Sequence, residues 1–174
     1  MNTFPPVEYQ YTKDDCAAAF QLHYTPTRFG WSICALIILA MCIAFFFFLR
    51  AESAPLLAQI IVPIGAALGG VLGGFFAWAV GSPWMGRRTY AKQPLAHLAK
   101  SITLRADGLH SQSARGEGIL LWRDFISWRT NGKTTLLYMS PHMFIIIPAR
   151  FADLGFPTDD LKATLTREIG PPRR

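Results

Sequence analysis

Two long uncharged apolar runs constrain this chain more than any other feature of its sequence. Gly30 to Leu49 is a run of 20 residues without a charge, and a second uncharged run extends from Leu56 to Val80. At a rise of 1.5 Å per residue, a helix of about 20 residues spans the hydrocarbon core of a bilayer. Two such helices would overfill the core of a soluble domain in a chain of 174 residues. The sequence therefore predicts two transmembrane helices, residues 30–49 and 56–80, joined by an external loop at 50–55.

The composition and the placement of charge agree with this interpretation. Charged residues make up 16% of the chain, whereas soluble domains have about 25%. The formal net charge is +6, and the part of the chain after residue 86 carries 14 Lys and Arg against 7 Asp and Glu. Because Lys and Arg next to membrane helices are retained in the cytoplasm, we expect both termini to be cytoplasmic. A nucleic-acid partner is not expected, because the positive charge begins directly after an apolar block.

The second apolar run contains glycines at regular helical spacing. Gly65, Gly69 and Gly73 form one ridge, and Gly70 and Gly74 belong to a second ridge beside it. In lipid, a ridge of small residues lets another helix approach closely. The ridges predict packing of the two helices against each other, with a homo-oligomer or a pore lining as alternatives. Transport is disfavoured because neither run contains an ionisable side chain.

The segment before the first run, residues 1–29, predicts a strand and a short helix. Residues 7–11 alternate apolar and polar side chains, as a half-buried strand does. Thr12 and Asp15 have the spacing of a helix-capping box. Because Val7, Tyr9 and Tyr11 need a partner surface to bury them, we expect this strand to join the C-terminal domain. An independent N-terminal arm is the alternative.

The part of the chain after the second run changes from a basic segment to a β-rich domain. Residues 81–100 form the basic segment, in which we expect a helix from Pro94 onward. Residues 101–174 contain six short apolar or alternating stretches, separated by turn signals such as Asp107-Gly108 and Asn131-Gly132. Thr158 to Ile169 has the period of an amphipathic helix. The predicted fold class is therefore an α+β membrane protein: a transmembrane hairpin with a small antiparallel sheet or partial barrel and a C-terminal helix in the cytoplasm.

Three short blocks stand out in the C-terminal half: Asp107-Gly108-Leu109, Trp122-Arg123-Asp124-Phe125 and Ile147-Pro148-Ala149-Arg150-Phe151. With these blocks the chain resembles the YcxB-like family of small bacterial membrane proteins. The resemblance implies a PH-like partial barrel and a place in the bacterial inner membrane. It implies no catalytic residues, because the family has no settled activity. We interpret these blocks as structural, with Trp122 and Trp128 filling the barrel and Arg150 pairing with Asp124 or capping the last helix.

The sequence contains no pattern that indicates an active site. The four histidines, which are scattered through the chain, are His23, His97, His110 and His142. None has a second His or a Cys at the spacing of metal ligands. We therefore expect no metal, no cofactor, no catalytic residue and no enzymatic activity.

The basic segment contains the side chains that we expect to contact the lipid surface: Arg87, Arg88, Lys92 and Lys100. Near an anionic leaflet each such charge contributes about 1 kcal/mol to membrane affinity. The alternative is that these charges only set the topology. Three functional hypotheses remain: a membrane-anchored module that binds a protein partner or lipid head groups, an immunity protein that neutralises a membrane-acting toxin, and a membrane-bound enzyme of unknown chemistry.

Overall fold

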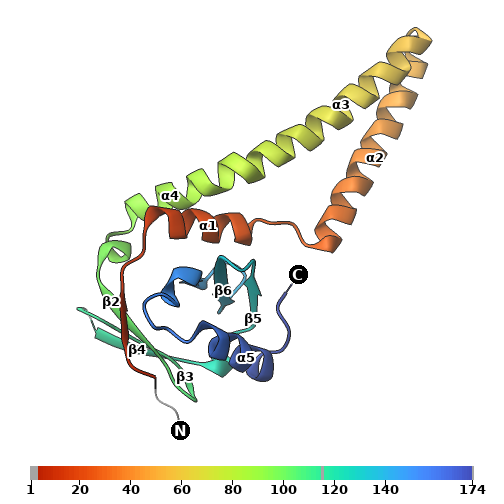
Figure 1. Cartoon of the computed structure of the whole chain (residues 1–174). Helices are drawn as coiled ribbons and strands as arrows, with labels where there is room; N and C mark the ends of the chain where they lie inside the picture. The colour runs from red at the N-terminus through yellow and green to blue at the C-terminus, as the bar shows by residue number, and fades with distance from the viewer. Residues whose placement is uncertain (1–3, 115, 174) are drawn as a thin grey trace. The chain divides into compact units, whose positions relative to one another are not determined.

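The computed structural model describes residues 4–114 and 116–173, without the side chains of Arg28, Phe29, Leu95 and Ala96. Residues 1–3 of the predicted N-terminal segment and Arg174 lie outside the described residues. The chain forms two compact units, one of residues 24–81 and one that combines residues 1–23 with 82–174. Figure 1 shows the elements of both units.

The unit of residues 24–81 is a helical hairpin. Helix α2 is Arg28–Ala51 and helix α3 is Leu56–Phe76, followed by a π-helical turn at Ala77–Gly81. Thr27 caps α2, since its Oγ1 accepts a hydrogen bond from the backbone N–H of Gly30 at 3.1 Å. The hairpin exposes most of its large apolar side chains, and a surface of this kind needs a lipid or protein covering. The segments Gly30–Ala51 and Leu56–Lys92 are long and apolar enough to cross a membrane.

Helical structure continues past the predicted end of the second helix at Val80. Helix α4, Ser82–Lys92, follows the π-helical turn directly. Proline inside a helix removes one hydrogen bond and clashes with the carbonyl four residues earlier, and here the π-helical turn just before Pro83 relieves both problems. The expected helix from Pro94 onward is wrong, because that segment is a short 3-10 turn, Pro94–His97, followed by a strand.

The second unit contains a four-stranded antiparallel sheet in the order β1-β2-β3-β4. Its strands are β1 Val7–Tyr9, β2 Lys100–Leu104, β3 Gly108–Ser113 and β4 Gly116–Leu121. The N-terminal strand β1 pairs with β2 in a register that places Val7 opposite Ile102 and Tyr9 opposite Lys100. This pairing confirms that residues from before and after the hairpin build one domain, and the alternative of an independent arm is wrong.

A second antiparallel sheet in the same unit has the order β5-β6-β7. Its strands are β5 Ser127–Thr130, β6 Thr134–Tyr138 and β7 Phe144–Pro148. Helix α5, Thr158–Glu168, follows and buries Leu161 and Leu165. The predicted six strands and C-terminal helix are thus confirmed. The Asn131-Gly132 turn between β5 and β6 has Gly132 at φ 83°, a conformation that favours glycine.

The core lies between these elements and includes both tryptophans that we expected there. Trp122 and Trp128 are buried. The Nε1–H of Trp122 donates to the Ala106 carbonyl at 2.9 Å, and that of Trp128 to the Gly170 carbonyl at 2.8 Å. Each indole therefore fills apolar volume while its one polar group stays paired, as a buried indole requires.

Helix α1, Lys13–His23, packs against the three-stranded sheet through Ala19 and Leu22. The predicted capping box at its start is confirmed: the backbone N–H of Thr12 donates to Asp15 Oδ2 at 2.8 Å, and that of Asp15 to Thr12 Oγ1 at 3.1 Å. Figure 1 shows α1 lying beside α4. Helix α1 therefore connects α4 to the β-structure.

Candidate membrane-surface interface

The structure divides the four predicted lipid-contact residues into two places. Arg87, Arg88 and Lys92 lie on α4, and all three are exposed. Lys100 is instead the first residue of β2, where its Nζ lies 5.5 Å from the centroid of the Tyr11 ring. Lys100 therefore does not belong to the same surface as the other three.

One face of α4 carries an aromatic ring and two positive charges at four-residue spacing. Trp84, Arg88 and Lys92 lie on one side of the helix because positions i, i+4 and i+8 share a face. The Trp84 side chain is 57% exposed, and the guanidinium of Arg88 lies 5.2 Å from its ring centroid. We call these three residues the α4 basic face. An exposed indole next to exposed cations is the combination found at membrane–water interfaces.

The opposite face of α4 packs tightly on α1. Ser82 and Gly86 are buried there. A Cβ at Gly86 would lie 2.5 Å from the carbonyl oxygen of Cys16 and 2.8 Å from the Cα of Ala17, so only glycine permits this approach. Positions 84 and 88 are two residues away from Gly86, which corresponds to a rotation of about 200° around the helix axis. Positions 84, 88 and 92 therefore point away from α1. Packing at Gly86 therefore orients the α4 basic face outward.

Arg87 forms an exposed ion pair with α1. Its Nη2 lies 3.1 Å from Oδ1 of Asp14, and the two side chains are 57% and 66% exposed. An ion pair this exposed contributes about 0–1 kcal/mol to stability. The pair partly neutralises Arg87, so the charges available on α4 are those of Arg88 and Lys92.

A second ion pair fixes α1 to the end of β7. Arg150 Nη2 lies 2.6 Å from Asp15 Oδ2, and Nε lies 3.1 Å from Oδ1. Burial alone would raise the pKa of Asp15, but hydrogen bonds from Arg150 and Thr12 outweigh it and lower that pKa below its ordinary value. The predicted pairing of Arg150 with Asp124 is wrong. Asp124 instead accepts a hydrogen bond from the Leu121 backbone N–H at 3.1 Å.

The buried thiol of Cys16 belongs to the residue that follows Asp15 on α1. Burial and the negative charge of Asp15 raise the pKa of Cys16 to about 11. Since the thiolate is the reactive form of cysteine, Cys16 behaves as a small apolar residue in the contact between α1 and α4.

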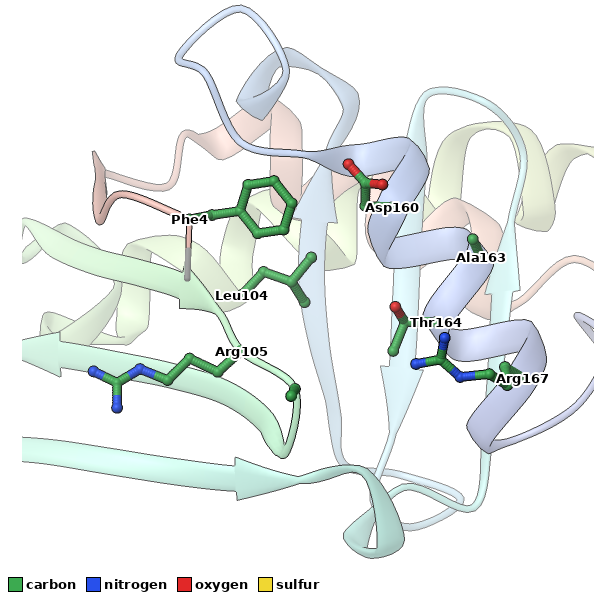
Figure 2. A pocket seen from close by; sticks show the side chains of 8 residues that line it. Phe4, Leu104, Arg105, Asp160, Ala163, Thr164 and Arg167 are labelled. Carbon is green, nitrogen blue, oxygen red and sulfur yellow. The ribbon is translucent and has the colours of Figure 1, made fainter. Parts of the chain in front are cut away.

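A groove of about 360 Å³ lies between the end of β2 and α5. Figure 2 shows Asp160, Thr164 and Arg167 on one side of α5, with Phe4 and Leu104 across from them. Arg105 directs its guanidinium away from α5. Asp160 and Arg167 are exposed, and Arg167 Nε is 2.9 Å from Glu168 Oε1. The groove is therefore an open, solvated surface with charges of both signs.

His23, His97 and His110 have different partners, and His23 also interacts electrostatically with His142. His23 Nδ1 is 3.2 Å from the Tyr138 hydroxyl, and the ring of His97 packs against Tyr90. His110 Nε2 lies 3.5 Å from Asp107 Oδ1. Within residues 4–114 and 116–173, no group of three or more His, Cys, Asp or Glu side chains is arranged to hold a metal ion.

The glycine ridges of α3 lie open. A Cβ at Gly65, Gly69, Gly70, Gly73 or Gly74 would meet nothing within 4 Å. The contact between α2 and α3 includes Cys42 and Pro63, with the Cys42 thiol 3.5 Å from the Pro63 carbonyl oxygen. None of the five glycines therefore makes close contact with α2, although Gly70 lines a small hollow between α2 and α3, and their packing role stays a prediction.

Sequence reasoning missed two residues that determine this interface. The sequence indicates only a helix-start position for Asp14. Gly86 was not identified, although Ser82 and Gly86 show a small-residue spacing of four that signals a close helix contact. The four basic residues were predicted from their charge alone. Charge does not show which of them share a face, and it did not show that Lys100 lies apart from the other three.

The chain is thus an α+β protein with two long apolar helices and two antiparallel sheets. Residues 104–154 match the family model described as YcxB-like protein. The matched segment runs from the last residue of β2 to just after β7, and it contains the three sequence blocks that carry the resemblance. The predicted family is confirmed over this segment. No curated protein and no solved structure matches the chain.

Proposed function

We propose that this protein is a non-enzymatic, multi-pass protein of the bacterial inner membrane that presents a cytoplasmic PH-like module for binding lipid head groups or a protein partner. The observation that carries the proposal is the α4 basic face. Its indole and two cations are exposed on the side of α4 that is opposite the α1 contact, and they directly follow a helix long enough to span a bilayer.

The length of the second helical segment supports membrane insertion. Residues 56–92 form 37 helical residues, whereas the hydrocarbon core requires about 20. The charged residues of this segment begin at Arg87. The α3 part therefore suits the hydrocarbon region, and the α4 part suits the head-group region and the water beyond it.

The topology supports the same side for both ends of the chain. Strand β1 precedes the hairpin and β2 follows it, yet the two strands pair directly. Paired strands must lie in one compartment, so the hairpin must enter and leave the bilayer on one face. The excess of Lys and Arg after α3 indicates that this face is cytoplasmic.

The sheet arrangement supports a PH-like module. A four-stranded sheet, a three-stranded sheet and a C-terminal helix enclose one core, which is the arrangement that the resemblance implies. In this interpretation the membrane hairpin is an insertion between the first and second strands of the barrel.

The test compares how two brominated lipids quench Trp84 in the full chain in lipid nanodiscs. The difference in fluorescence between the wild type and W84F isolates Trp84 from the other tryptophans. We expect brominated phosphatidylglycerol to quench Trp84 more than brominated phosphatidylcholine does. The double variant R88Q/K92Q removes two charges of about 1 kcal/mol each, so the preference for the anionic lipid should fall by roughly tenfold or more.

The matched control is R123Q/K133Q, which removes two exposed charges of the β-rich unit and should keep the preference. Equal quenching of the wild type by the two lipids would contradict the proposal. An equal loss of preference in the control variant would also contradict it.

A second candidate function, immunity against a membrane-acting toxin, is favoured by one observation. The glycine ridges of α3 have open space around them, so the helix of a toxin or of a second copy of the chain has room to pack there. Co-expression with a toxin encoded beside the gene tests this idea. Survival that is lost in G69L/G73L but kept in R88Q/K92Q supports it, and survival independent of the glycines contradicts it.

A further inference from the structure

A small cavity lies between the inner face of the four-stranded sheet and strand β7. Its volume is about 140 Å³. Apolar walls are contributed by Ile102 and Leu120 from the four-stranded sheet and by Ile145 from β7. The residues that line it also include Tyr9, Tyr11, Lys100 and Ser111, whose side chains end in polar groups. The cavity is thus mostly apolar, with one cation.

Lys100 reaches this cavity because of its position in β2. Alternate residues of a strand share a face, so Lys100 lies on the same side as Ile102 and Leu104, which are both buried in the core. Its Nζ is 5.5 Å from the centroid of the Tyr11 ring. Among the described residues, no carboxylate oxygen lies within 4 Å of this Nζ. Lys100 is a half-buried residue, and an ammonium group without a carboxylate partner favours the binding of an anion.

The two tyrosines are fixed in place beside the lysine. The Tyr11 hydroxyl donates to the Ile146 carbonyl at 2.8 Å, and the Tyr9 ring packs 4.5 Å from the ring of Phe151. Burial raises the pKa of both tyrosines, so the two phenols stay neutral at physiological pH. The rings therefore form a rigid uncharged wall, and Lys100 is the only charged side chain among the eight residues that line the cavity.

The size of the cavity limits the ligand. An apolar cavity of about 150 Å³ accepts a molecule the size of benzene, so this cavity accepts about six or seven non-hydrogen atoms. Ligand pockets are commonly apolar with a few placed polar groups that fix the orientation of the ligand. Here the placed polar group is the Lys100 cation. It favours a ligand with an anionic group at one end of a short apolar chain.

We propose that this cavity binds a small aliphatic carboxylate of four or five carbons, with its carboxylate on Lys100 and its alkyl chain against Ile102, Leu120 and Ile145. The binding requires no contact with the membrane. It adds a small-molecule site to the interior of the β-rich unit, separate from the α4 basic face.

The test uses the full chain in nanodiscs with its lysines ¹³C-methylated. The chain has five lysines, so the spectrum contains few lysine signals, and single substitutions assign them. Addition of pentanoate should shift the Lys100 signal saturably and leave the Lys92 signal unchanged. The neutral analogue 1-pentanol should not shift the Lys100 signal.

Two variants distinguish the contribution of the Lys100 charge to pentanoate binding from that of the cavity. K100M removes the charge, and pentanoate binding measured by ligand line broadening should weaken at least tenfold. I145F keeps Lys100 and fills the cavity, so the Lys100 signal should no longer respond to pentanoate. The signals of the remaining lysines report whether each variant stays folded.

Parallel, unsaturable shifts of Lys92 and Lys100 would overturn the proposal, and so would unchanged pentanoate binding by K100M. Neither outcome bears on the lipid-surface proposal, because that proposal depends on Arg88 and Lys92 and is measured through Trp84.

Discussion

Asp15 and Arg150, which are 135 positions apart in the chain, form a two-point ion pair with N···O distances of 2.6 and 3.1 Å. The same arginine donates to the Gln10 carbonyl at 2.7 Å. The pair joins the start of α1 to the turn after β7. Since α1 also packs on α4, this contact fixes the position of the α4 basic face relative to the sheets.

Replacing Asp15 with asparagine should destabilise the β-rich unit by about 2 kcal/mol. The Asp15 side chain is 8% exposed and that of Arg150 is 38% exposed, so D15N removes a charge-assisted hydrogen bond from a half-buried pair and leaves the Arg150 charge only partly solvated, at a cost of about 1.5–3 kcal/mol. Denaturant unfolding in mild detergent micelles, followed by near-UV circular dichroism, measures the change. The control D159N removes a carboxylate that is 95% exposed, so it should change the free energy of unfolding by less than about 0.5 kcal/mol.

The effect of D15N should depend on pH. Because the folded-state pKa of Asp15 is lowered below its ordinary value of 3.8, its contribution is present above that value and is lost as the pH falls through the folded-state pKa. The difference in stability between the wild type and D15N should therefore be full at pH 6 and shrink below pH 4. A difference that is the same at pH 6 and pH 3 contradicts the ion pair as its source.

Adding one methyl group at Gly86 should loosen α4 from α1. The new Cβ would lie 2.5 Å from the Cys16 carbonyl oxygen, so G86A forces a backbone shift that costs about 1–3 kcal/mol. Hydrogen exchange of the α1 amides should accelerate in this variant. G81A is the matched control, because a Cβ at Gly81 meets nothing within 4 Å. Unchanged exchange in G86A would show that the helices do not pack as described.

Strand β1 should contribute to stability as part of the core. Tyr9 is 7% exposed, so Y9A should cost about 3–5 kcal/mol, as deletions of large buried rings do. Glu8 points to the other side of the same strand and is exposed, so E8A should be nearly neutral. The comparison of the two unfolding free energies is decisive, because an N-terminal arm outside the core would make both changes small.

The glycines of α3 should be dispensable for the fold of a single chain. A Cβ at Gly69 or Gly73 meets open space, and alanine has the higher helix propensity. We expect G69A/G73A to leave the thermal unfolding temperature unchanged or slightly higher. If the variant melts at a clearly lower temperature, the glycines pack inside the hairpin after all.

Local sequence patterns predicted most elements of the fold. Alternation and turn signals predicted β2 to β7, and the capping box of Thr12 and Asp15 predicted the start of α1. These features depend on residues close together in the chain. The partner of Arg150 and the place of Lys100 depend on which distant segments meet, and charge or spacing alone does not contain that information.

The continuation of the second helix into α4 was missed for a different reason. Gly81 and Pro83 are both helix-breaking residues by ordinary propensity. The π-helical turn at Ala77–Gly81 accommodates the proline, and a local turn of this type has no clear sequence signal. Arg88 and Lys92 of the α4 basic face were therefore predicted from their charge, but the direction that they share with Trp84 was not.

The most direct test of the account is the sidedness of three single cysteines in a chain whose native cysteines are replaced by serine. The variants are E8C in β1, S101C in β2 and S53C in the loop between α2 and α3, and each is reacted with a membrane-impermeant maleimide in right-side-out and inverted vesicles. The account predicts that E8C and S101C react only in inverted vesicles and S53C only in right-side-out vesicles. Reaction of E8C and S101C from opposite faces, or of all three cysteines from both faces, would contradict it.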